Sequence, residues 1–196
     1  MQTEDSCKVS SKIACLYPQH VEIINRDGTR KCMSIEIGSI TTDEIIKLYP
    51  KILKELKKRG IIKTKNLIGE LGEYLAIKHY NQNSQFPNLS LAETTTKNID
   101  AGSRDGERYS IKSVSGTSTG VFHGLEKPDS TKSDKQIFEY VIIVIFDDNY
   151  ELDSILEINW EQFLEIKKWH TTMQAWNIPI NSSLKKMAKN IFLRES

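Results

Sequence analysis

An acid, a lysine and an upstream glutamate follow one another in an order that suits metal-dependent chemistry. Asp100 and Lys112 lie on two segments of alternating polarity that meet at Asp105-Gly106, a strong signal for a β-hairpin. Two antiparallel strands would hold the acid and the lysine side by side. Glu73 ends the run Gly69-Glu-Leu-Gly-Glu73, which lies in a segment of helical spacing.

These residue types match the chemistry of phosphodiester hydrolysis. Carboxylates bind Mg²⁺, which lowers the pKa of a bound water and neutralises the charge that develops on the phosphate. A lysine beside the metal can orient that water or help to deprotonate it. The sequence therefore predicts that Asp100 and Glu73, or Glu70 one helical turn earlier, bind a metal and that Lys112 acts on the water.

Simpler interpretations exist for each residue alone. Asp100 fits an ordinary turn or strand-end aspartate, and Lys112 fits a strand residue that faces solvent. Glu70 and Glu73 fit the solvated edge of a helix. The three features together, in this order, favour a metal site.

The surrounding pattern predicts the elements that would position these side chains. Apolar residues at helical spacing indicate helices, whereas alternating or continuous β-branched runs indicate strands. We expect helices over residues 65–80, 160–169 and 182–193, and strands over residues 89–93, 97–104, 107–115, 138–146 and 150–158. This order predicts an α/β domain with a mixed central sheet of about five strands flanked by helices. Residues 116–135 read as a long polar loop.

The N-terminal residues differ from this domain. Residues 1–40 read as an extension with a β-hairpin around Arg26-Asp-Gly28, and residues 41–196 as the domain, with its core at about 66–158. Thr41 and Glu44 form a capping-box pattern at the start of a helix that Gly60 ends. Pro50 either kinks that helix or splits it.

The composition narrows the setting but not the partner. The longest apolar run, residues 140–146, is far too short to span a bilayer, so we expect no membrane partner. The chain shows no secretory signal, and its 3 cysteines lack C-x-x-C spacing, which favours free thiols in the cytoplasm. The net charge of +1 identifies no partner by itself.

The distribution of charge and hydroxyl groups is more informative than the total. Basic residues crowd a short stretch before the Gly-Glu segment, and polar residues follow Lys112. As nucleic-acid contacts we consider Lys57, Lys58, Arg59, Lys63 and Lys65, together with Ser113, Ser115, Thr117 and His123. The alternatives are a solvated helix face for the first group and a flexible polar loop for the second.

The order of these motifs resembles the PD-(D/E)XK nuclease superfamily, which includes many type II restriction endonucleases. The similarity covers about residues 66–158: a helix with Gly-Glu-x-Gly-Glu, a strand ending near Asp100, a hairpin, Ile111-Lys112, and the buried run Phe138-Glu-Tyr-Val-Ile-Ile-Val-Ile-Phe146. It implies a restriction-endonuclease-like fold in which Asp100 is the central metal ligand and Lys112 the catalytic lysine. It also implies that the Ile111 carbonyl reaches the metal.

The resemblance implies a Mg²⁺-dependent endonuclease that cuts double-stranded DNA, as a restriction or defence enzyme, and a homodimer, because two strands need two sites. Ser110 departs from the pattern, since it occupies the position of the family's second acid. We expect it to assist catalysis by hydrogen bonding, and Glu73 to replace the missing ligand. The same departure motivates two alternatives: an inactive module that binds nucleic acid or a protein, and a regulatory or structural protein with no nucleic-acid role.

Overall fold

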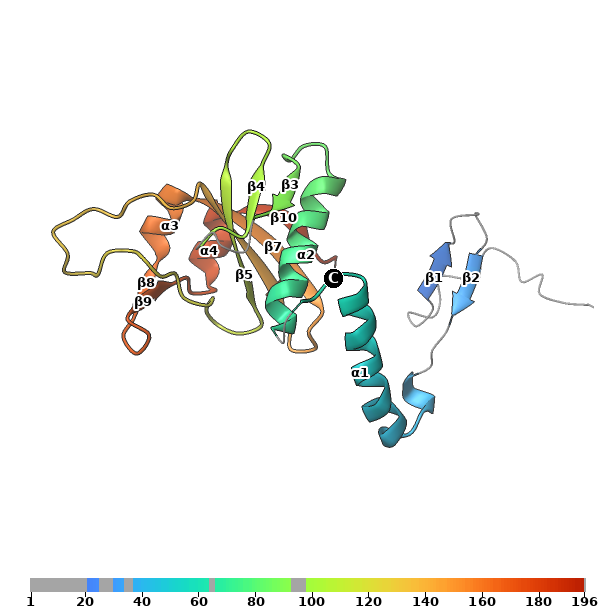
Figure 1. Cartoon of the computed structure of the whole chain (residues 1–196). Coiled ribbons are helices and arrows are strands. Elements are labelled where there is room, and N and C mark those ends of the chain that lie inside the picture. Colours follow the sequence, from blue (N-terminus) through green and yellow to red (C-terminus); the bar gives the residue numbers. More distant parts are fainter. Residues whose placement is uncertain (1–20, 25–29, 34–36, 64–65, 93–97, 196) are drawn as a thin grey trace, which may run out of the picture. The chain divides into compact units, whose positions relative to one another are not determined.

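A six-stranded mixed sheet forms the centre of the larger of two units into which the chain divides, residues 1–55 and 56–196 (Figure 1). The computed structural model describes residues 21–24, 30–33, 37–63, 66–92 and 98–195. The elements of the larger unit, after the end of α1 (Thr42–Lys58), are α2 (Leu67–Gln82), β3 (Leu89–Leu91), β4 (Ala101–Ser103), β5 (Arg108–Val114), β6 (Tyr140–Phe146), β7 (Leu152–Asn159), α3 (Trp160–Ile166), β8 (Lys168–His170), β9 (Ala175–Asn177), α4 (Ser182–Met187) and β10 (Lys189–Leu193).

The strand order of the sheet is β10-β7-β6-β5-β4-β3. Only β5 and β6 pair in parallel, and the other neighbours are antiparallel. The prediction of an α/β chain with a mixed sheet flanked by helices is therefore confirmed, with six strands in place of about five. A parallel pair needs a long connection, and residues 115–139 supply it without a helix.

Successive side chains along a strand point to opposite faces of the sheet, and both faces of this sheet are apolar. Residues Ile142, Val144 and Phe146 of β6 pack with Ala76 and Tyr80 of α2. The intervening residues of β6 pack on the opposite side with Phe163 of α3 and Leu184 of α4. Because β6 is covered on both faces, its sequence reads as a continuous apolar run.

The C-terminal segment corrects one prediction. The helix expected over residues 182–193 ends at Met187, and residues 189–193 form β10 along the edge of β7. Ile191 and Phe192 pack against the α2 side of the core. Pairing with β10 satisfies backbone groups of β7 that would otherwise be left at a buried edge, which overrides the helical spacing of this short segment.

The long connection between β5 and β6 is anchored at several points. Trp176 donates its indole N–H to the Glu126 carbonyl at 2.7 Å, and Lys167 forms an ion pair with Asp134. Phe122 pairs as an isolated bridge with Trp176. The polar loop predicted for residues 116–135 therefore lies against the β8–β9 hairpin.

In the smaller unit, β1 (Val21–Ile24) and β2 (Arg30–Met33) pair antiparallel, so the two runs that predicted a hairpin form one; its turn lies outside the described residues. A short 3₁₀ helix, Ile37–Ser39, precedes α1. The Thr41 hydroxyl caps α1 and Glu44 accepts from Thr41, as the capping box predicts. Pro50 lies inside α1 without ending it.

The boundary between the extension and the domain at residue 40 stays a prediction.

Gly60, with φ of 70°, follows the end of α1, as expected for a glycine that stops a helix. Among the helices that the structure describes, none is both long and apolar enough to span a bilayer.

Candidate active site

Asp100 lies where the pairing of β4 with β5 ends. Its N–H donates to the Tyr109 carbonyl at 2.9 Å, and the described register of the two strands covers only Ala101 with Tyr109 and Gly102 with Arg108. Beyond this point the Asp100 side chain makes the next contact with β5: its Oδ2 accepts the Ile111 N–H at 2.7 Å. The carboxylate is thus fixed by the backbone of β5.

Lys112 reaches the same carboxylate from β5. Its Nζ lies 3.9 Å from Asp100 Oδ2 and 5.2 Å from the centre of the Phe122 ring. Both side chains of the ion pair keep about a quarter or less of their surface exposed, 22% for Lys112 and 26% for Asp100. The structure therefore brings together the acid and the lysine that the sequence singled out.

Ser110 supports Asp100 from inside the fold. Its exposed fraction is 0%, and its hydroxyl donates to Asp100 Oδ2 at 3.3 Å. Because Ser110 is fully buried, the assistance by hydrogen bonding that we predicted for it would act through Asp100, as a positioning role. Ile111 contributes its N–H to Asp100, and the predicted contact of its carbonyl with a metal stays a prediction.

Helix α2 lies close to β5 because Gly72 has no side chain. A Cβ on Gly72 would lie 1.8 Å from Ser113 Oγ and 2.9 Å from Ser113 Cβ, so α2 rests directly on β5 there. The Ser113 hydroxyl donates to the Gly69 carbonyl at 3.4 Å. Ser113 therefore takes part in this packing, and its contact with nucleic acid stays a prediction.

Glu73 lies half-buried beside other acids. Burial raises the pKa of its carboxyl, and the negative charges of Asp100 and Glu70 raise it further. The positive charges of Lys112 and Lys63 act in the opposite direction but with less effect. Negative charge at this position thus exceeds what the neighbouring lysines balance.

Glu70 makes a hydrogen bond within the fold. Its carboxylate accepts the N–H of Lys63 and so ties the segment that enters α2 to the helix. Asn66 caps α2, since its side chain accepts from the Gly69 N–H at 3.3 Å. We therefore rank Glu73 above Glu70 as a metal ligand.

The acids open into a cleft of about 820 Å³. Glu70, Glu73 and Asp100 line it, and the other lining residues come from α2, from the segment before it and from the chain around β3 and β4. The lining residues are Gly60, Ile61, Lys63, Asn66, Glu70, Glu73, Tyr74, Ile77, Lys78, Asn81, Leu91, Ala92, Ile99 and Asp100. An external molecule or ion can therefore reach the carboxylates.

The predicted nucleic-acid contacts are distributed around this region. Lys57, Lys58 and Arg59 are exposed at the end of α1, and exposed Lys63 borders the cleft. Lys65 lies outside the described residues. Ser115, Thr117 and His123 are exposed in the loop after β5.

Two residues near Asp100 escaped prediction. Asn98 adopts φ of 63° and donates from Nδ2 to the His123 carbonyl at 3.1 Å, which ties the polar loop to the strand that carries Asp100. Phe122 provides the ring beside Lys112. Asparagine tolerates the left-handed conformation, which is a local signal, but its loop partner is 25 residues away and leaves no local trace.

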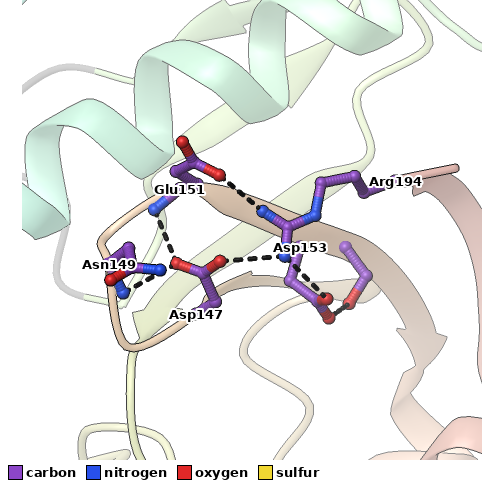
Figure 2. Close-up of polar contacts among 6 residues, drawn as sticks. Asp147, Asn149, Glu151, Asp153 and Arg194 are labelled. Atoms are coloured by element: carbon purple, nitrogen blue, oxygen red, sulfur yellow. Dashed lines mark hydrogen bonds and ion pairs between the residues drawn. The ribbon is translucent and has the colours of Figure 1, made fainter. Parts of the chain in front are cut away.

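A second group of acids lies at the turn between β6 and β7 (Figure 2). Asp147 Oδ1 accepts the N–H groups of Asn149 and Glu151, both at 2.9 Å, and Arg194 donates to Asp147 at 2.8 Å and to Glu151 at 2.9 Å. The hydrogen bond from Glu151, followed by that from Arg194, lowers the pKa of Asp147. This group thus contains its own cation.

Within the part of the chain that the structure describes, no three acidic, histidine or cysteine side chains converge as a ready metal site. The arrangement at Asp100 therefore offers two carboxylates, those of Asp100 and Glu73, with a lysine beside them. Comparison of the chain with protein-family models and with curated protein sequences gave no match.

Proposed function

We propose that this chain is a Mg²⁺-dependent endonuclease that hydrolyses DNA phosphodiester bonds, with the restriction-endonuclease-like arrangement of the PD-(D/E)XK superfamily. One observation carries the proposal: the Asp100 carboxylate is fixed by the Ile111 amide, lies 3.9 Å from the Lys112 ammonium and opens into the same cleft as Glu73. We infer a role in restriction or defence from the resemblance alone.

The donor set fits Mg²⁺. This ion binds proteins through one or two carboxylates and keeps several of its waters, so two acids suffice. Asp100 and Glu73 would hold it, and the excess negative charge that raises the pKa of Glu73 favours a cation there. When bound, Mg²⁺ would supply an acidified water and neutralise charge on the phosphate.

Lys112 would orient the attacking water or neutralise the phosphate. The ammonium is restrained by Asp100 on one side and by the Phe122 ring on another, which limits the geometries it can adopt. Ser110 and the Ile111 amide hold the carboxylate that aligns this group. A fixed acid and lysine of this kind meet the demand for preorganised charge.

Exposed cations near the cleft would bind the DNA backbone. Lys57, Lys58, Arg59 and Lys63 can contact phosphates, which gives affinity that depends on salt and not on sequence. Ser115, Thr117 and His123 remain proposed contacts from the loop. Double-strand cleavage would require a homodimer.

A second candidate rests on Ser110. The position of the family's second acid holds a buried hydroxyl, so the site has one ligand fewer than a complete set. An inactive nuclease-fold module that binds nucleic acid or a protein would fit this observation. Such a module would bind DNA in a salt-dependent way, without metal binding and without loss of affinity in Lys112→Ala.

Cleavage assays with matched acid variants decide between the candidates. The wild type, Asp100→Asn and Asp147→Asn are incubated with supercoiled plasmid and linear duplex in Mg²⁺, in Mn²⁺ and in EDTA. We expect cleavage by the wild type and by Asp147→Asn, which changes an acid at the turn between β6 and β7, and none by Asp100→Asn or in EDTA. Equal rates for wild type and Asp100→Asn would refute the nuclease proposal.

A further inference from the structure

The cleft extends well beyond the two proposed metal ligands. From Glu73 it continues along α2 past Tyr74, Ile77 and Lys78, and Leu91 lines it from β3. Its volume of about 820 Å³ lies within the range of roughly 300–1,000 Å³ that is typical of small-ligand sites. Two carboxylates and their ion do not need this much space.

The lining of the cleft also exposes an aromatic ring and apolar surface. Tyr74 is 42% exposed and Leu91 is 50% exposed, and half-buried Ile77 lies between Tyr74 and Lys78 on α2. Exposed Lys63 and Lys78 add positive charge to the lining. A planar group that stacks on a ring and carries a nearby negative charge would satisfy both features.

The amide side chains in the lining do not select a hydrogen-bonding pattern. Asn81 donates to the Leu89 carbonyl at 2.9 Å and accepts the Leu89 N–H at 2.7 Å, so it clamps β3 to α2. Asn66 caps the helix. The cleft thus offers stacking and charge without a fixed code for base edges, which is typical of sites that bind nucleotides of any sequence.

A base within a duplex cannot enter such a cleft, because its faces are covered by its neighbours. Enzymes that receive a base in a pocket act on single strands or on extruded nucleotides. We infer that the cleft between α2 and β3 receives one unpaired nucleotide, stacked on Tyr74, next to the phosphate cut at Asp100. This inference rests on the proposed function and names its substrate class: DNA with an unpaired nucleotide beside the scissile bond.

Cleavage of matched oligonucleotides tests the inference. A duplex, the same duplex with one unpaired nucleotide, and the corresponding single strand are compared at equal concentration in Mg²⁺. We expect cuts within one or two nucleotides of the unpaired position, at least about 10-fold faster than in the duplex, the scale of one stacking contact. Tyr74→Ala should bring this ratio close to one, Tyr74→Phe should keep it, and Tyr150→Ala, which removes an exposed tyrosine elsewhere, is the control.

A binding measurement separates this inference from the nuclease proposal. A 2-aminopurine at the unpaired position loses fluorescence when it stacks, so its quenching is measured with the Asp100→Asn protein. Quenching that Tyr74→Ala abolishes and Tyr74→Phe retains would support the cleft even if no variant cleaves DNA. Equal cleavage of all three substrates, or quenching that is unchanged in Tyr74→Ala, would overturn the inference while leaving the nuclease proposal in place.

Discussion

The two acidic groups of the larger unit differ in how their charge is balanced. Around Asp147, backbone N–H groups and Arg194 meet the carboxylates, and the pKa of Asp147 is lowered (Figure 2). Around Glu73, burial and two neighbouring acids raise the pKa of the carboxyl. The Asp147 carboxylate is held by hydrogen bonds from the chain and fixes a turn, whereas the Glu73 carboxylate is half-buried beside two like charges, a place where an external cation would be stabilised.

Substitution of the cation in each group, Lys112 in one and Arg194 in the other, gives the largest expected difference in cleavage rate. Lys112→Met removes the ammonium 3.9 Å from Asp100, and we expect DNA cleavage to fall by roughly 10²- to 10⁴-fold, the scale of a lost acid–base group. Arg194→Met removes the cation at Asp147, and we expect an unchanged cleavage rate. Single-turnover rates at saturating protein measure both effects.

Equal losses of cleavage in Lys112→Met and Arg194→Met would contradict the predicted difference between the two groups. To exclude unfolding as the cause, the melting temperature of each variant is measured alongside the rate. Arg194 is well exposed, and surface ion pairs contribute little, so only a small drop in melting temperature is expected for Arg194→Met.

The second prediction concerns the packing that places Glu73 near Asp100. Gly72→Ala introduces a Cβ only 1.8 Å from Ser113 Oγ, so α2 must move away from β5. We expect a loss of about 1–3 kcal/mol in the free energy of unfolding, as for other overpacked cores. Denaturant titration measures this loss, and weaker cleavage should accompany it.

Two variants test the cause of that loss. Gly120→Ala places a Cβ where no atom lies within 4 Å, so its effect should stay within about 0.5 kcal/mol. Ser113→Gly removes the two atoms that the new Cβ would clash with, and it should restore part of the stability to Gly72→Ala. If the double variant were no more stable than Gly72→Ala, the steric explanation would be wrong.

Local patterns were sufficient to predict the centre of the fold. The continuous apolar run of β6 reflects burial on two faces, and Asp105-Gly106 marked the β4–β5 turn. The edge strand at the C-terminal end of the domain could not be predicted in this way. Residues 189–193 form β10 because β7 needs a partner, and that need arises from residues far away in the sequence.

The residues of the site also divide into those that local patterns predict and those that they do not. That Asp100, Lys112 and Glu73 lie near one another could be predicted, because their types and order suggested one arrangement. Phe122 beside Lys112 and Asn98 beside His123 could not, since each contact closes a loop whose path has no local signal. The burial of Ser110 explains why a hydroxyl suffices there: it only has to donate to Asp100.

The smallest predicted effect is an opposite response of the two groups to pH. The folded-state pKa of Glu73 is raised, so the native state binds the extra proton, and stability falls as pH rises from the usual value of 4.5 through the folded pKa. The pKa of Asp147 is lowered, so its contribution is present above the usual value of 3.8 and is lost as pH falls through the folded pKa.

Glu73→Gln should therefore raise the melting temperature at pH 7.5, whereas Asp147→Asn should lower it. Both changes are expected to be on the order of 1–3 °C, because the groups are only partly shielded from solvent. The Glu73→Gln effect should shrink near pH 4, below the usual value of 4.5, where the wild-type carboxyl is protonated like its amide replacement, whereas the Asp147→Asn effect should persist there and shrink only as pH falls below 3.8. Scanning calorimetry in EDTA at the two pH values measures the shifts without bound metal. If Glu73→Gln destabilised the protein at pH 7.5, the Glu73 carboxylate would already have a stabilising partner in the fold, and the contrast between Glu73 and Asp147 would be lost.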